Sequence, residues 1–280
     1  MISRLSVTIV RACLREGHGG SPTAVLDEVP LSDAERCRVP VLAGTSHAVF
    51  VAPRGSEVSL RFFTAEGELP ACGHGTVAAL AFLAERAGGP EYRGTLRAAG
   101  RSFAGRAVRE GARVRAAFEP GPVGLREPTT AERGLVLPAL RVPPGALAPG
   151  ARVASIGRER LLVPVASRSA LTALAPHFDR LRAACDRFGF LGCYVYSVPT
   201  RSGRIAARMF APSIGVPEDI ANANSTACLA AALAGRGVTG ITVDMGDALG
   251  SPATITASAR PVPQVGGVAE VEAAARELAV

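Results

Sequence analysis

The chain carries the same short pattern twice, once in each half. In the first half, residues 61–65 (RFFTA) lead through a turn to residues 71–83 (ACGHGTVAALAFL). In the second half, residues 208–212 (RMFAP) lead to residues 223–233 (ANSTACLAAAL). Each copy predicts an extended strand, a turn with small polar residues, and a short helix that is apolar on nearly every face.

These two helices constrain the fold more than any other feature of the sequence. A helix that is apolar all round has to be buried on all sides. Its first N–H groups then need a partner, and a bound carboxylate is a good one. We therefore predict an α+β fold of two pseudo-symmetric halves, each a mixed sheet wrapped around a central helix, with an anion-binding cleft where the two helix starts face each other.

The distribution of proline and glycine suggests where the halves divide. Within the connecting stretch, Thr129 and Glu132 have capping-box spacing and predict the start of a helix. The predicted organisation is an N-terminal half over 1–120 with its central helix at about 74–87, a Pro/Gly-rich connection over 121–152, a C-terminal half over 153–265 with its central helix at about 225–235, and a C-terminal helix within 266–280 that docks on one half.

The composition excludes several classes of protein. All 31 basic residues are arginine. Without a lysine, the chain can form neither a Schiff base nor a Walker-type phosphate loop. No GxGxxG lies between a predicted strand and a helix, so a dinucleotide fold has no support. The net charge is +7, but the arginines are scattered and aromatic residues make up only 5%, so we expect no nucleic-acid partner.

The cysteines, histidines and apolar segments predict a cytoplasmic protein without a metal. The six cysteines form no CxxC pair and are expected to be free thiols, mostly buried. With only four histidines and no clustered ligands in the sequence, we expect no metal site. No apolar stretch approaches the ~18 residues of a membrane span. Arg4, Arg11 and Arg15 interrupt the N-terminal apolar segment, so it does not read as a secretion signal.

Several motifs together resemble the phenazine-biosynthesis PhzF-like isomerases, which share the diaminopimelate epimerase fold. The resemblance covers essentially the whole chain. Its most specific part is the block that runs from Arg61 to Thr76, which resembles the family's RxFTPxxELPxxGHxT. The other matching segments are 20–25 (GSPTAV), 210–212 (FAP) with 215–219 (GVPED), 250–252 (GSP) and 265–267 (VGG).

The resemblance implies a set of site residues. The family's general acid/base is a glutamate in a segment of the form SETxFV; here residues 46–51 read SHAVFV, which puts His47 in its place. His47 is interpreted as the proton shuttle, because imidazole exchanges protons near neutral pH. His74 and Asp219 would position the substrate and complete the catalytic set. The implied substrate-binding residues are Ser46, Cys72, Gly73, Gly75, Asn224, Ser225 and Thr226.

Several of these residues also have a purely structural interpretation, which for Asp219 is that of a turn residue. His47 could be an ordinary strand histidine, and His74 a capping or packing residue. Ser225 and Thr226 could simply cap the second central helix. Cys72 takes the place of one catalytic thiol of the epimerases, but the corresponding residue of the second copy is Ala223, so Cys72 is better interpreted as a small wall residue.

The leading hypothesis is a cofactor-independent isomerase that moves a proton and a double bond within a small unsaturated acid or cyclic amino acid. By resemblance, and because a lysine-free, arginine-rich chain suggests a high-GC bacterium, we place it in secondary metabolism, in the supply of an antibiotic precursor such as a 4-alkylproline. The alternatives are an amino-acid racemase or epimerase, and a ligand-binding homologue that has lost catalysis. The expected partner is a small anionic or amino-acid substrate rather than a membrane; relatives are commonly homodimers.

Overall fold

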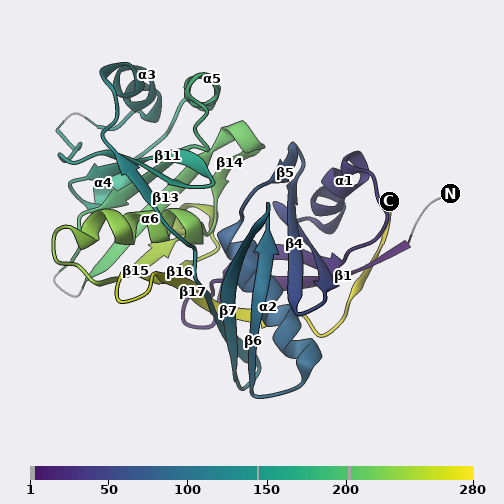
Figure 1. The fold of residues 1–280 in the computed structure, drawn as a ribbon. Helices are drawn as coiled ribbons and strands as arrows, with labels where there is room; N and C mark the ends of the chain where they lie inside the picture. The colour runs from purple at the N-terminus through teal and green to yellow at the C-terminus, as the bar shows by residue number, and fades with distance from the viewer. Residues whose placement is uncertain (1–3, 144, 201–202) are drawn as a thin grey trace.

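The computed structural model describes residues 4–143, 145–200 and 203–280, which form two lobes (Figure 1). The strands are β1 (Arg4–Ala12), β2 (Ser21–Asp27), β3 (His47–Arg54), β4 (Glu57–Thr64), β5 (Gly67–Leu69), β6 (Glu91–Ala98), β7 (Arg101–Glu110), β8 (Arg113–Phe118), β9 (Gly124–Arg126), β10 (Arg152–Ile156), β11 (Arg158–Val165), β12 (Cys193–Ser197), β13 (Arg204–Ala211), β14 (Val216–Asp219), β15 (Gly240–Met245), β16 (Ala253–Ser258), β17 (Gln264–Val271) and β18 (Arg276–Ala279). The helices are α1 (Asp33–Ala43), α2 (Gly73–Ala87), α3 (Thr130–Leu140), α4 (Arg168–Thr172), α5 (Phe178–Phe188) and α6 (Ala223–Ala234), with short 3-10 turns at Pro212–Ile214 and Asp247–Leu249.

The first lobe is a closed barrel around α2. Pairing runs from β1 through β2, β3, β4, β6, β7, β8 and β17 and returns to β1. The β2–β3 and β4–β6 pairs are parallel and the others antiparallel. Residues 73–81 of α2 are all buried, as an all-apolar helix requires.

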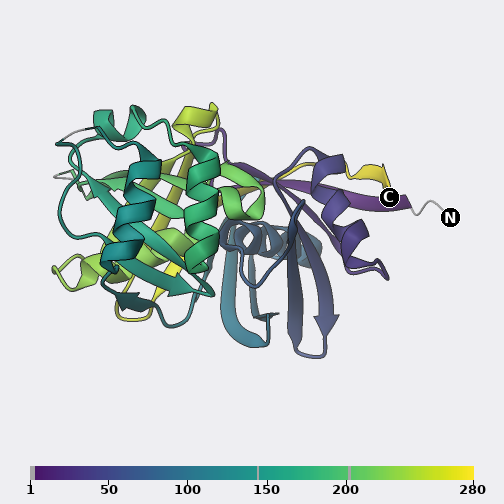
Figure 2. The same ribbon diagram turned by 90° about the horizontal axis from the view of Figure 1, so that it is seen from above.

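The second lobe has a second curved sheet, which packs around α6. Its sheet runs β9–β10–β11–β12–β13–β15–β16–β17, with β14 added beside β13. Helices α3 and α5 cover the outer face of this sheet (Figure 2), where Val136 and Leu140 of α3 and Leu181 and Cys185 of α5 form a second core with residues of β11. The predicted α+β class with two central helices is confirmed.

The predicted C-terminal helix is wrong. Residues 264–271 form β17 and residues 276–279 form β18, which pairs with β1. Strand β17 pairs with β8, β16 and β1, so its backbone groups gain sheet partners that an isolated helix would lack. These tertiary pairings outweigh the helix propensity of an alanine- and glutamate-rich segment. A boundary at residue 265 also cuts through β17, which belongs to both sheets.

The capping residues predicted from the sequence agree with the structure at α3 and differ from it by two residues at α6. Thr129 and Glu132 form the expected capping box at the start of α3, inside the connecting stretch. Helix α6 begins two residues earlier than expected, because Asn222 rather than Ser225 is its N-cap. All six cysteines lie in the described residues and are free thiols, and five of them are buried. In the same residues no helix combines the length and the apolarity needed to cross a bilayer.

Candidate active site

The starts of the two central helices touch each other. A Cβ added to Gly73 would lie 2.6 Å from the backbone nitrogen of Asn224 and 2.7 Å from the Cβ of Ala223. Only glycine therefore allows α2 to approach α6 so closely. The two ends leave no room for a ligand at this point; open space begins beside them, in a cavity that Cys72 and Asn224 line.

His47 lies in the first lobe, where its ring contacts His74 at the start of α2. It is the first residue of β3 and is opposite Thr23 in the parallel β2–β3 pair. Its side chain is buried, and Nδ1 lies 2.9 Å from the Oγ of Ser46. When Nδ1–H donates to this hydroxyl, Nε2 remains as the unprotonated, basic nitrogen. The same hydroxyl can instead donate to an unprotonated Nδ1, so Ser46 orients the ring of His47 in either tautomer.

The three predicted catalytic residues lie side by side. The rings of His47 and His74 meet edge to face, with centroids 4.4 Å apart. Nδ1 of His74 is 3.8 Å from Oδ2 of Asp219. Asn222 donates to the same Oδ2 at 2.9 Å, whereas Oδ1 of Asp219 is buried without a hydrogen-bond partner among the described residues. An N–H or O–H group of a ligand would satisfy that oxygen.

The two histidines have opposite pKa shifts. Burial, together with the neighbouring His74, holds the pKa of His47 well below its usual 6.5. Burial also disfavours the charged form of His74, but the neighbouring Cys72 and Asp219 favour that form and raise the pKa of His74 to about 9. Burial raises the pKa of Asp219, while the charge of His74 and the hydrogen bond from Asn222 act against that rise. The site therefore combines a His47 imidazole that favours its neutral form with a His74 imidazole that favours its charged form.

Cys72 also belongs to this cluster. Its Sγ lies 3.6 Å from Nε2 of His74. His47, Cys72 and His74 offer ligand atoms that all lie within 4.8 Å of one another, a donor set that suits a soft divalent cation such as Zn²⁺. The sequence suggested no metal because these residues form no ligand motif along the chain. The fold brings them together, so their spacing in the sequence does not exclude a metal.

The other expected binding residues divide into two groups. Asn224 and Cys72 line the cavity. Gly75 leaves space for the Cys72 sulfur, because a Cβ added to Gly75 would lie 3.0 Å from that sulfur. Ser225 and Thr226 are fully buried and bonded inside the protein. The Ser225 N–H donates to Asn222, and the hydroxyl of Thr226 lies 2.8 Å from that of Tyr194.

Sequence reasoning missed two polar residues around the site. Asn222 links the α6 cap to Asp219, since its Oδ1 accepts from Ser225 and its Nδ2 donates to the carboxylate. Arg160 is almost completely buried, and its guanidinium donates to Ser225 Oγ at 3.3 Å and to two backbone carbonyls. Its positive charge lies at the start of α6, where the helix dipole is also positive, so both increase the positive potential at this helix end. No local motif marks Arg160, which comes from β11.

Comparison with known proteins identifies the family. Residues 15–273 match the family described as phenazine biosynthesis-like protein, PhzC-PhzF. The chain belongs to this PhzF-like family. Among curated relatives, an uncharacterized isomerase of Deinococcus radiodurans is 29% identical over 91% of this chain and 89% of its own length. The uncharacterized isomerase YddE of Escherichia coli K12 is 28% identical over 74% of this chain and 71% of its own length.

Solved structures agree with this family assignment. A predicted epimerase from Pseudomonas aeruginosa superposes with a TM-score of 0.85 at 26% identity, covering 98% of this chain and 99% of that one. A hydroxyproline epimerase from Agrobacterium vitis shares the fold alone, with a TM-score of 0.64 and 12% identity over 99% of this chain and 93% of that one. The expectation of a PhzF-like isomerase is confirmed at the level of family and enzyme class.

Proposed function

We propose that this PhzF-like protein is a cofactor-independent isomerase that moves a proton, and with it a double bond, within a small unsaturated acid or cyclic amino acid. The observation that carries the proposal is the edge-to-face contact of two buried histidines, His47 and His74, beside the carboxyl group of Asp219. Their surroundings lower the pKa of His47 and raise that of His74. A base must be unprotonated to accept a proton, and a donor must be charged to stabilise the resulting anion most strongly.

The proposed reaction uses one base for both proton transfers. His47 takes a proton from the carbon next to the activating group, and the released electron pair spreads into the conjugated system. The imidazolium of His47 then returns the proton to the far carbon of that system, so the double bond shifts and the composition is unchanged. His74 donates to the developing negative charge, and the free Oδ1 of Asp219 accepts from a substrate N–H or O–H.

Access to the reacting groups requires movement. His47, His74 and Asp219 are each at most 3% exposed. A substrate can reach them only if the lobes separate around the contact between Gly73 and Asn224 and then close again. Closure would exclude water from the transferred proton. The first-turn N–H groups of α2, which has no side-chain cap, lie next to this contact and favour an anionic substrate.

The experiment that tests this function follows deuterium in D₂O with a panel of dehydro amino acids. We expect an ultraviolet change as conjugation shifts, with deuterium at the distal carbon wherever the His47 proton exchanges with solvent before it is returned. Deuterium only at the α-carbon, with scrambled chirality and no ultraviolet change, would instead show a racemase or epimerase. Cys72 next to His74 favours that second candidate, and Ala223 in place of a second thiol weighs against it. Binding of panel members without any turnover would show an inactive homologue.

Removal of metal ions is expected to leave turnover unchanged. In the proposed mechanism His47 needs a free lone pair, and a metal held by His47, Cys72 and His74 would occupy it. Turnover is measured before and after exhaustive dialysis against EDTA, with metal content followed in parallel. Activity that disappears with the metal and returns with Zn²⁺ would contradict the cofactor-independent reaction.

We also propose, from the resemblance and the composition, a role in secondary metabolism that supplies an antibiotic precursor. Such a precursor would be a substituted cyclic amino acid. If the panel shows activity only on acyclic dehydro amino acids, this part of the proposal fails while the isomerase assignment stands.

A further inference from the structure

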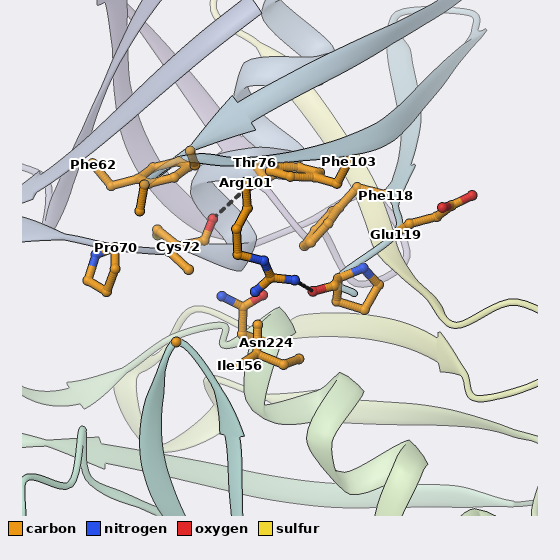
Figure 3. Close-up of a pocket in the computed structure, with 15 residues that line it drawn as sticks. Phe62, Pro70, Cys72, Thr76, Arg101, Phe103, Phe118, Glu119, Ile156 and Asn224 are labelled. Carbon is orange, nitrogen blue, oxygen red and sulfur yellow. Dashed lines mark hydrogen bonds between the residues drawn. The ribbon is translucent and has the colours of Figure 1, made fainter. Parts of the chain in front are cut away.

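A cavity between the two lobes lies next to the candidate active site; Cys72 lines it, whereas His47, His74 and Asp219 do not. Its volume is about 220 Å³, and it begins at Cys72 and Asn224, next to the start of each central helix. Figure 3 shows side chains of the first lobe on one side and, facing them, Asn224 and the β10–β11 hairpin of the second lobe. This volume lies below the ~300–1,000 Å³ of sites for drug-sized ligands, so it suits one small molecule or part of one.

The walls of this cavity are mainly nonpolar. Phe62, Phe103 and Phe118 come from β4, β7 and β8, and Ile156 closes the opposite side. The rings of Phe103 and Phe118 are 5.8 Å apart between centroids and tilted by 55°. Phe62 and Phe118 are buried in the core, whereas Phe103 is half-buried and faces the cavity. A ligand that fills this space contacts aromatic rings along much of its length.

One cation, Arg101, also lines the cavity, and its side chain is exposed to solvent. Figure 3 shows the Arg101 side chain reaching into the space above Asn224. Its one hydrogen bond to the described residues is to the Pro120 carbonyl at 3.3 Å. Arg101 forms no ion pair with any of the described residues, although Glu119 also lines the cavity. Arg106 on the same strand is different, because its Nε lies 2.6 Å from a carboxylate oxygen of Glu91. Most of the N–H groups of Arg101 are therefore available to a ligand.

We propose that Arg101 is a specificity-determining residue that binds the carboxylate of a substrate whose nonpolar body lies against Phe103 and its aromatic neighbours. This inference rests on the proposed function, because it places the acid group at Arg101 and directs the reacting end of the substrate towards Cys72. The Sγ of Cys72 is 3.6 Å from Nε2 of His74, and the reacting carbon reaches the histidines when the lobes open and close. A guanidinium binds a carboxylate through paired, charge-assisted hydrogen bonds. The Asn224 amide in the opposite wall supplies a further donor. The substrate class is a carboxylic acid with a nonpolar ring or chain.

The test uses three simple probes with the full-length protein. Benzoate carries both the charge and a nonpolar body, benzamide keeps the body without the charge, and acetate keeps the charge without the body. Dissociation constants are measured by calorimetry or by NMR titration. We expect benzoate to bind at least about tenfold more tightly than either of the others, since a hydrogen bond to a charged group and a buried ring each contribute at least that much.

Variants of the protein then separate the contribution of the charged hydrogen bond from that of the nonpolar contact. Arg101→Gln should weaken benzoate about tenfold and leave benzamide within about twofold. Phe103→Ala should weaken benzoate and benzamide alike. The matched controls are Arg106→Gln on the same strand and Phe178→Ala on α5, which should change neither affinity. Thermal unfolding of every variant shows whether it keeps the fold.

Two results would overturn the inference. One is equal affinity of the unchanged protein for benzoate and benzamide, and the other is unchanged benzoate affinity in Arg101→Gln. Binding of these probes requires no turnover, so the outcome is independent of the isomerase assay. Isomerisation in D₂O combined with a failed probe test would keep the proposed function and reject Arg101 as its carboxylate-binding residue.

Discussion

Replacing His47 with alanine is expected to reduce turnover by about 10²- to 10⁴-fold, the contribution typical of general acid–base catalysis. The substitution removes the neutral imidazole that accepts and returns the proton, and its cationic neighbour His74 cannot accept a proton in its place. Turnover is measured with whichever dehydro amino acid the unchanged protein isomerises. Ligand affinity should fall much less than turnover, because Asp219 and the helix starts remain.

Two further variants separate catalysis from structure. His47→Glu restores a proton-accepting group at the position where the family has its glutamate, so it should keep measurable turnover. His18→Ala removes an exposed histidine outside the site and should have no effect. If His47→Ala is as active as His18→Ala while both remain folded, His47 is not the proton shuttle.

Replacing Asp219 with asparagine is expected to lower turnover by about 10²-fold and to change its pH dependence. Together with Cys72, the carboxylate of Asp219 favours the charged form of His74, and a cationic donor aimed at a developing negative charge contributes about this much. In the unchanged protein, turnover should fall as the pH rises through about 9, where His74 loses its proton. Without the negative charge of Asp219 the pKa of His74 is lower, so the decline should begin at a lower pH.

The pH profile is the decisive part of this experiment. A merely structural role for Asp219 would lower turnover at every pH without moving the alkaline limb. Asp186→Asn on the exposed side of α5 is the matched control and should keep both turnover and profile. An unchanged alkaline limb in Asp219→Asn would show that this carboxylate does not set the charge of His74.

The sequence predicted the main frame of the fold because both central helices have an unusual composition. Each is apolar on every face, and such a helix can only be an interior helix. The same reasoning from local composition fails for the C-terminal segment, which forms strands and not the predicted helix. Its alanines and glutamates suggest a helix. Residues 264–271 instead form a strand because they pair with β1, β8 and β16, and these partners are distant in the sequence, so no local pattern predicts the pairing.

The predicted site depended on a repeated motif, whereas the electrostatics depended on the fold. The repeated motif predicted that His74 and the start of α6 lie at the same site. His47 was predicted only from the resemblance to the family, whose glutamate it replaces. Burial and the precise neighbours of each histidine determine which one is charged, and these are tertiary properties. Arg160 was missed because it comes from a sheet strand that carries no motif, and only the folding of the second lobe brings it to the start of α6.

The central claim is that His47 is a neutral base and His74 its cationic neighbour, and NMR titration of the imidazole nitrogens tests it without a substrate. The four histidines are assigned with single His→Ala variants, and their ¹⁵N shifts are followed from pH 5 to pH 10. We predict that His47 stays neutral at pH 7 and gains a proton only well below pH 6.5, while His74 stays charged until about pH 9. Two histidines that titrate together near pH 6.5 would contradict the account.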